Sequence, residues 1–188
     1  RTQNRAVTGD DYETLSDQFS TEFQGQIGKS KAILRQYGCA ANVIDLYILA
    51  LDEKNDLMEA GNELKSALSE ELQSKKMITD HVCIRDGVVI RVDVALDVVV
   101  DKFYRKFEDE IKERISSKMN NFFSLNKWDY NQDLKIVDLV KELSDIKEIK
   151  TTEVNFVTDN DSNSGEDVVA RFFEIIRPGT IDINFIYE

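Results

Sequence analysis

The stretch that decides the fold is Val88–Met119, which reads VVIRVDVALDVVVDKFYRKFEDEIKERISSKM. As far as Val100 every second residue is apolar, and this period of two predicts a strand with one face in a core. The opposite parity carries Arg91, Asp93 and Asp97, so we expect that face of the strand to lie in solvent.

From Asp101 onward the period changes to that of an amphipathic helix with an aromatic stripe. If the strand and this helix form the core, replacing Val94 or Phe107 by Ala is expected to cost about 2–5 kcal/mol through cavity formation. The apolar side chains that recur on this helix are Phe103, Phe107, Ile111, Ile115 and Met119.

The pattern along the chain predicts an α+β fold with two small lobes, residues 1–101 and 102–188, in which helices pack on mixed or antiparallel sheets. The long strand and helix join the two lobes. The first lobe is expected to run helix, strand, strand, helix, strand, with residues 20–29 forming a loop. The predicted helices span residues 8–19 and 57–76, and the predicted strands span residues 32–37, 43–51 and the segment from 88.

The second lobe is expected to continue with an aromatic connector, a short helix and further strands. Residues 168–176 are apolar on both parities, which predicts a strand covered on both faces by its own helices or by a partner. Pro178 and Gly179 are expected to form a turn before the last strand. The predicted elements are a helix over 136–143 and strands over 147–157, 168–176 and 181–187.

The charge balance makes some partners unexpected. The chain of 188 residues has 36 acidic against 24 basic residues and a net charge of −12, so neither nucleic acid nor an anionic membrane is an expected partner. No apolar run approaches the roughly 20 residues of a membrane span, and no apolar segment of a signal peptide follows the first residues. The chain does not begin with Met, and we expect it to be part of a longer protein.

Two short motifs resemble ligand-binding loops without matching them. Residues 25–30 end in Gly-Lys-Ser like a phosphate-binding loop, but Phe23 occupies the place of the first required Gly. Residues 159–167 resemble the start of a calcium-binding EF-hand loop. Ser164 replaces its central Gly and Ala170 its final Glu, so an acidic hairpin loop is the favoured interpretation.

The remaining reactive side chains form no recognisable catalytic set. His81 is the single histidine and shares a strand parity with Cys83, without an evident orienting acid. Cys83 and Cys39 are expected to be free thiols rather than a pair. We interpret two aromatic pairs, Trp128 with Tyr130 and Phe172 with Phe173, as core residues in preference to binding residues. We therefore predict no catalytic, cofactor-binding or metal-binding residues.

The segment Arg5–Leu15, RAVTGDDYETL, resembles the R-A-V-T-x-x-D-Y-x-x-L segment of the baseplate J family, proteins of contractile phage tails and related injection machines. The resemblance continues in order through nearly the whole chain. It includes the strand with Ile48–Leu51, the strand region of residues 80–100, the helix with Phe107 and the connector with Trp128. The family's Gly after that Trp is absent from this chain.

The resemblance is closest to the C-terminal portion of the ring-forming baseplate wedge subunit of large contractile-tail phages. It implies a structural protein of the virion and not an enzyme. Such a subunit links wedges into a ring, rearranges on tail contraction, binds itself and other baseplate wedge proteins, and assembles in the host cytoplasm. The alternative is a small-ligand or calcium-binding regulatory domain on a ferredoxin-like scaffold, with residues 159–167 as its site.

Overall fold

The computed structural model describes residues 5–22, 25–37, 41–158 and 167–188. Contacts divide the chain into two units, residues 1–89 and 90–188. Helices and mixed or antiparallel sheets build both units, which confirms the predicted α+β class. The boundary expected from the sequence lay after residue 101. The contacts place it after Val89, because β6 (Val88–Val100) pairs with a strand of the second unit.

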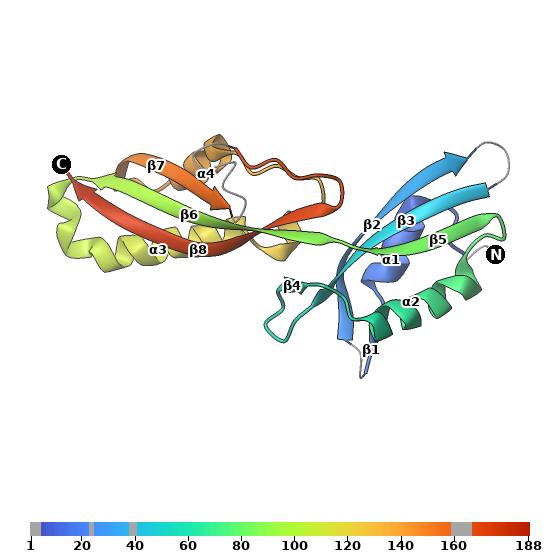
Figure 1. Cartoon of the computed structure of the whole chain (residues 1–188). Helices are drawn as coiled ribbons and strands as arrows, with labels where there is room; N and C mark the ends of the chain where they lie inside the picture. Colours follow the sequence, from blue (N-terminus) through green and yellow to red (C-terminus); the bar gives the residue numbers. More distant parts are fainter. Residues whose placement is uncertain (1–4, 23–24, 38–40, 159–166) are drawn as a thin grey trace. The chain divides into compact units, whose positions relative to one another are not determined.

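The central strand of the first unit is β3 (Ala41–Leu51) (Figure 1). It pairs antiparallel with β2 (Gly25–Tyr37) and parallel with β5 (Asp80–Asp86). Two short strands, β1 (Ser20–Thr21) and β4 (Leu57–Met58), extend the sheet beside β2 and β3. Both helices of the unit pack on the face of this sheet that carries Ile44, Leu46 and Ile48.

Helices α1 (Gly9–Asp17) and α2 (Asn62–Lys75) supply the apolar side chains that cover that face. In α2 the buried residues recur at intervals of four, which places them on one side of the helix. The fully or nearly fully buried members of this core include Tyr12, Ile27, Ile44, Leu46, Ile48, Leu64, Leu68 and Leu72.

A side chain at position 28 of β2 would crowd two leucine side chains, which favours the glycine found there. The ladder between β2 and β3 shifts register after Ile27, as a β-bulge does. A Cβ atom at Gly28 would lie 2.7 Å from the Cδ2 of Leu57 and 2.8 Å from the Cδ2 of Leu51. The Gly-Lys-Ser motif at residues 28–30 therefore belongs to a strand and is no phosphate-binding loop.

The second unit has β6 as its central strand, between β7 (Ile149–Thr158) and β8 (Glu174–Tyr187). β7 pairs antiparallel with β6, with Val94 opposite Phe156 and Leu96 opposite Val154. The apolar parity predicted for β6 is the buried one.

Several contacts show that β8 runs parallel to β6. The Asp93 Oδ1 atom accepts from the Thr180 backbone N–H at 2.5 Å, and Asp97 Oδ1 accepts from Asn184 Nδ2 at 2.9 Å. The two residues of each pair are 87 positions apart in the sequence, so β6 and β8 run in the same direction. The backbone N–H of Glu188 donates to the Val100 carbonyl at 3.1 Å and closes this pairing.

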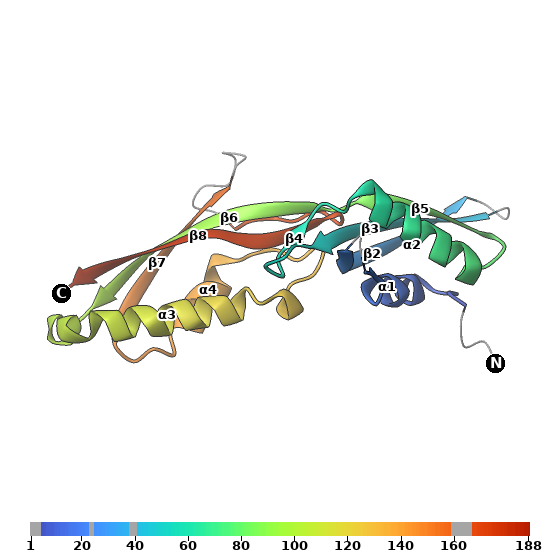
Figure 2. The ribbon, with the colours of Figure 1, turned by 90° about the horizontal axis from the view of Figure 1, so that it is seen from below.

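The described helices of the second unit lie on one side of its sheet (Figure 2). A 3₁₀ turn, η1 (Lys102–Phe107), leads into α3 (Glu108–Phe122), and η2 (Leu125–Lys127) precedes α4 (Ile136–Leu143). The core between helices and sheet includes Val92, Val94, Leu96, Val98, Val100, Ile111, Ile115, Met119, Leu139, Leu143, Val154 and Phe156.

The aromatic connector belongs to this core, as predicted for Trp128, which is 3% exposed. The Trp128 ring stacks on Phe123 with centroids 5.7 Å apart, and its Nε1 donates to the Phe122 carbonyl at 2.8 Å. The buried Arg177 donates from Nη1 to the Phe123 carbonyl at 2.7 Å, so β8 also holds the end of α3. Phe172, in contrast, is 44% exposed and is not a core residue.

The prediction that Phe103 and Phe107 form the apolar stripe of the helix is wrong. They are 76% and 44% exposed, whereas Ile111 and Ile115 are fully buried. Residues 102–107 form a 3₁₀ helix, which has three residues per turn. Residues four apart in it do not lie on the same face, so Phe103 and Phe107 do not continue the buried stripe of Ile111 and Ile115.

Other predicted boundaries also change. Residues 20–29 hold β1 and the start of β2 instead of a loop, the second helix begins at Asn62, and β5 was not predicted as a separate strand. Residues 168–173 form only an isolated bridge at Val168 before β8. β8 runs unbroken through Pro178, where a turn was expected. A proline is tolerated there because β8 lies at the edge of the sheet.

We predict that Ile111→Ala destabilises the chain by about 2–5 kcal/mol, the cost of a cavity in a packed core. Phe107→Ala on the preceding turn is the matched control and is expected to cost less than about 1 kcal/mol, as for a surface substitution. Urea unfolding followed by circular dichroism measures both. Equal losses for the two variants would contradict a core centred on Ile111 that leaves Phe107 outside.

Candidate functional site

The segment that carries the family resemblance forms a capping box at the start of α1. Thr8 Oγ1 accepts from the Asp11 backbone N–H at 3.2 Å, and Asp11 Oδ2 accepts from the backbone N–H groups of Thr8 at 2.8 Å and Val7 at 2.9 Å. These backbone hydrogen bonds lower the pKa of Asp11. Thr8 and Asp11 therefore satisfy backbone donors that the helix leaves unpaired.

Two further residues of this segment connect it to the rest of the first unit. The backbone N–H of the buried Ala6 donates to the carbonyl of Lys75 at the end of α2, at 2.9 Å. The buried Tyr12 donates its hydroxyl to Asp80 Oδ2 at 2.9 Å, and Asn42 donates to Asp80 Oδ1 at 3.2 Å. The segment thus ties α1 to α2 and to the first residue of β5, and its residues have a structural role.

We predict that Tyr12→Phe lowers the free energy of unfolding by about 1–3 kcal/mol, because it leaves a buried carboxylate oxygen without its donor. Burial and Asp80 raise the pKa of Tyr12. The folded state therefore holds this proton more tightly, and the contribution is complete below pH about 10 and is lost at higher pH. Unfolding measured from pH 7 to pH 11 should show a steeper alkaline loss for the wild type than for Tyr12→Phe. Identical profiles would contradict this role.

The face of the first sheet opposite its helices contains a buried carboxylate between two arginines. Asp45 is 1% exposed. Its Oδ1 lies 2.7 Å from the Nε of Arg85 on β5, and its Oδ2 lies 2.7 Å from the Nε of Arg35 on β2. The side chains of Arg35 and Arg85 are 45% and 52% exposed, so water still reaches the cations. The two guanidinium groups compensate the cost of burying the charge of Asp45.

We predict that this Arg-Asp-Arg cluster behaves as one unit. Either Arg35→Ala or Arg85→Ala leaves Asp45 one cation, whereas the double variant leaves a buried charge without either. The double variant should therefore lose more stability than the sum of the two single losses. In an Asp45→Asn background the same substitutions should cost little. Additive losses in chemical denaturation, in both backgrounds, would refute this coupling.

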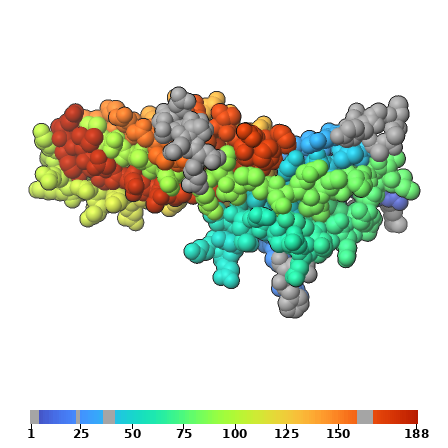
Figure 3. Space-filling model, viewed as in Figure 1, coloured from blue at the N-terminus to red at the C-terminus, as the bar shows by residue number. Residues whose placement is uncertain are grey.

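The face of the second sheet opposite its helices is acidic and exposed. Asp97 lies directly opposite Glu153 in the ladder between β6 and β7, an arrangement of like charges that destabilises a sheet. Hydrogen bonds from the Thr180 side chain and backbone lower the pKa of Asp93, at the other end of this face. Figure 3 looks onto this side of the unit, where β6 and β8 reach the surface.

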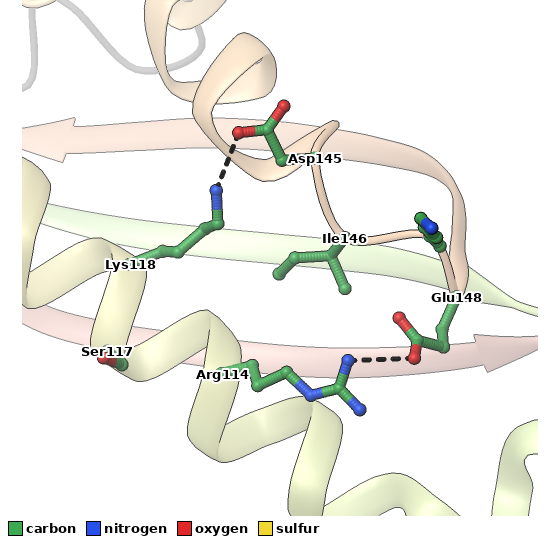
Figure 4. A pocket seen from close by; sticks show the side chains of 7 residues that line it. Arg114, Ser117, Lys118, Asp145, Ile146 and Glu148 are labelled. Atoms are coloured by element: carbon green, nitrogen blue, oxygen red, sulfur yellow. Dashed lines mark hydrogen bonds and ion pairs between the residues drawn. The ribbon is translucent and has the colours of Figure 1, made fainter.

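A pocket of about 380 Å³ lies between α3 and the segment that follows α4 (Figure 4). Lys118 Nζ lies 3.0 Å from Asp145 Oδ2, and Arg114 Nη1 lies 2.9 Å from Glu148 Oε1. A hydrogen bond from its own backbone N–H, with Arg114 in addition, lowers the pKa of Glu148. These charges pair with each other across the pocket, so they hold α3 against the turn into β7. The lining residues are Arg114, Ser117, Lys118, Asp145, Ile146, Lys147 and Glu148.

The reactive residues considered from the sequence come together in part. His81 and Cys83 share the open face of the first sheet, because their β3 register partners are Val43 and Asp45. Cys83 is a free thiol, and Cys39 lies outside the described residues. Among the described residues, no three His, Cys, Asp or Glu side chains are grouped so as to hold a metal ion.

The possible calcium loop at residues 159–167 lies outside the described residues, except for Asp167. Asp167 Oδ1 accepts from the Ile136 backbone N–H at 2.9 Å, at the start of α4. Within the described residues, neither unit has the β-α-β-β-α-β order of a ferredoxin-like scaffold, so that part of the alternative is wrong. None of the helices in the described part of the chain has the length and apolar character that a membrane crossing needs.

Comparison with known proteins gives a match in structure alone. No family model matches the chain, and no curated protein matches its sequence. A chain in the cryo-EM structure of the anti-feeding prophage baseplate matches with a TM-score of 0.58 and 10% identity. The two chains share a fold. The alignment covers 94% of this chain and 38% of that one, so this chain spans well under half the length of the baseplate protein it matches.

The residues that sequence reasoning missed are the charged ones on the two open sheet faces. Asp45 is a single carboxylate inside the apolar run of β3, and such a residue in a buried strand predicts a paired cation. Its partners, Arg35 and Arg85, lie on strands that only the strand pairing brings beside it. The acidic face of β6 was predicted to be solvent-exposed, but its combination with Glu153 and Asp182 depends on the register.

Proposed function

We propose that this chain is a structural subunit of a contractile phage tail baseplate, which links wedges into a ring and rearranges on tail contraction. The observation that carries the proposal is the fold shared with the anti-feeding prophage baseplate chain over 94% of this chain. The resemblance of Arg5–Leu15 to the baseplate J family supports the same conclusion from the sequence. Fold alone does not determine function, so the proposal needs a test in the assembled particle.

The structural role assigned to the Arg5–Leu15 segment fits a subunit that works through the geometry of its surfaces. Thr8, Asp11 and Tyr12 hold α1, α2 and β5 together, and none of them is placed to act on a substrate. On this proposal the chain is no enzyme. Its partners are other baseplate wedge proteins and further copies of itself, as a dimer or ring, and it assembles into the virion tail in the host cytoplasm.

Deleting the coding sequence from the particle that carries it should leave no contractile tails in electron micrographs. The wild-type chain and Phe107→Ala should both restore tails, because the Phe107 side chain is largely outside the core. Ile111→Ala should restore fewer, and fewer still on warming. Gold-labelled antibody against the chain should mark the baseplate end of complemented tails. Normal tails in the deletion strain, or label confined to another part of the particle, would refute the proposed function.

A further inference from the structure

The open face of the first sheet has an excess of basic side chains around the buried Tyr47 and Leu49, although the chain as a whole is strongly acidic. Strand pairing places four cationic side chains on this face, around one buried carboxylate, Asp45. Because Asp45 binds the Nε atoms of both arginines, it fixes where the two guanidinium groups lie. His81 shares the face and is exposed. The cationic residues are Lys29, Lys31 and Arg35 on β2 and Arg85 on β5.

The open face of the second sheet has the opposite charge. Over the part of this face that is level with Asp93–Val99 of β6, the described residues of the three strands include four carboxylates and no Lys or Arg. Asp93 and Asp97 come from the central strand, Glu153 from β7 and Asp182 from β8. Asn155, Asn184 and Thr180 share this face with the apolar Ala95 and Val157, so the face is mostly polar as well as acidic.

A solvated sheet face needs polar side chains, but it does not need charges of a single sign. Mixed charges would avoid the repulsion between Asp97 and Glu153, which lie directly opposite each other. A chain with 36 acidic and 24 basic residues has enough of both kinds to mix them. Pairing with Asp45 explains Arg35 and Arg85, and pairing with Glu13 explains Lys31. Folding of the second unit does not explain why its open face carries carboxylates alone, whereas electrostatic complementarity to the basic face does.

We propose that these two faces bind each other between copies of this chain. The open face of the first unit of one copy docks on the open face of the second unit of the next. This contact joins two different surfaces, so each copy keeps one face for another neighbour, and repetition gives a ring or a filament. The inference rests on the proposed baseplate function, in which copies of the chain assemble around a tail.

The size of the faces indicates that a single contact is weak. Three strands about 4.8 Å apart and about 23 Å long give a face of roughly 330 Å², or about 660 Å² for both partners. That is below the roughly 1,000 Å² expected of a stable interface. Carboxylates and guanidinium groups would instead give the contact its orientation and its salt dependence. A closed ring, in which every copy makes two such contacts, would be far more stable than one pair.

Sedimentation of three forms of the chain at low and high salt tests the proposal. One form reverses two of the four charges on the acidic face, with Glu153→Lys and Asp182→Lys. A second form reverses the basic face, with Lys29→Glu and Lys31→Glu. At about 20 mM salt the wild type should form species larger than a monomer as its concentration rises to about 1 mM, and about 0.5 M salt should dissolve them.

Each reversed form alone should stay monomeric, because one of its two faces has lost the net charge that attracts the other face. An equimolar mixture of the two forms should associate again, since each form supplies the face that the other has lost. Matched controls change the net charge equally at exposed positions of η1 and α3: Glu110→Lys with Glu113→Lys, and Lys106→Glu with Lys112→Glu. These controls should associate like the wild type.

Lys31 lies 3.1 Å from Glu13 on α1, so its reversal could disturb the fold. A second basic-face variant, Lys29→Glu with His81→Glu, leaves that ion pair in place, and thermal unfolding of every form checks the fold. A wild type that stays monomeric at the highest concentration and low salt would overturn the inference. So would a mixture of folded reversed forms that fails to associate. A different result would refute the proposed function alone: the two faces bind in sedimentation, but the gold label is absent from the baseplate.

Discussion

The alternation of apolar and polar side chains along β6 is the constraint on which the second unit depends. Its buried parity, from Val92 to Val100, packs against α3 and α4, while the other parity stays in solvent. A shift of one residue in the pairing with β7 would bury Asp93 and Asp97 and expose the core side chains. The hydrogen bonds from Thr180 and Asn184 to these two carboxylates fix the same register on the other side.

In the first unit the corresponding constraint is that two buried carboxylates each need partners from other elements. Asp80 and Asp45 are 4% and 1% exposed, and each is held by residues from other elements. Asp80 joins Tyr12 of α1 to the start of β5, on the helix side. Asp45 joins β2 and β5 across β3 on the opposite face. Asp80 therefore depends on the pairing of β5 with β3, and Asp45 on the pairing of β2, β3 and β5, which makes the sheet specific as well as stable.

Residue patterns predicted the α+β class, the central strand and the position of α4, because these depend on local periodicity. They failed where contacts between residues far apart in the sequence determine the local structure. Phe107 has the spacing of a helical stripe, but it lies in a 3₁₀ turn and faces solvent. Pro178 predicts a turn, yet it lies within β8. Proline has no backbone N–H, and an edge strand tolerates this because one of its sides makes no strand pairing. The two open faces combine residues from three strands each, and no local pattern indicates which strands will be neighbours.

The most direct test of a structural role in the baseplate is a cryo-EM reconstruction of the intact tail of the particle that encodes this chain. A baseplate subunit should give density in the baseplate, repeated around the tail axis, that both the first unit and the second unit fit with their sheets and helices. A baseplate without density for either unit, or a fit of the chain only in the sheath or the capsid, would contradict this role.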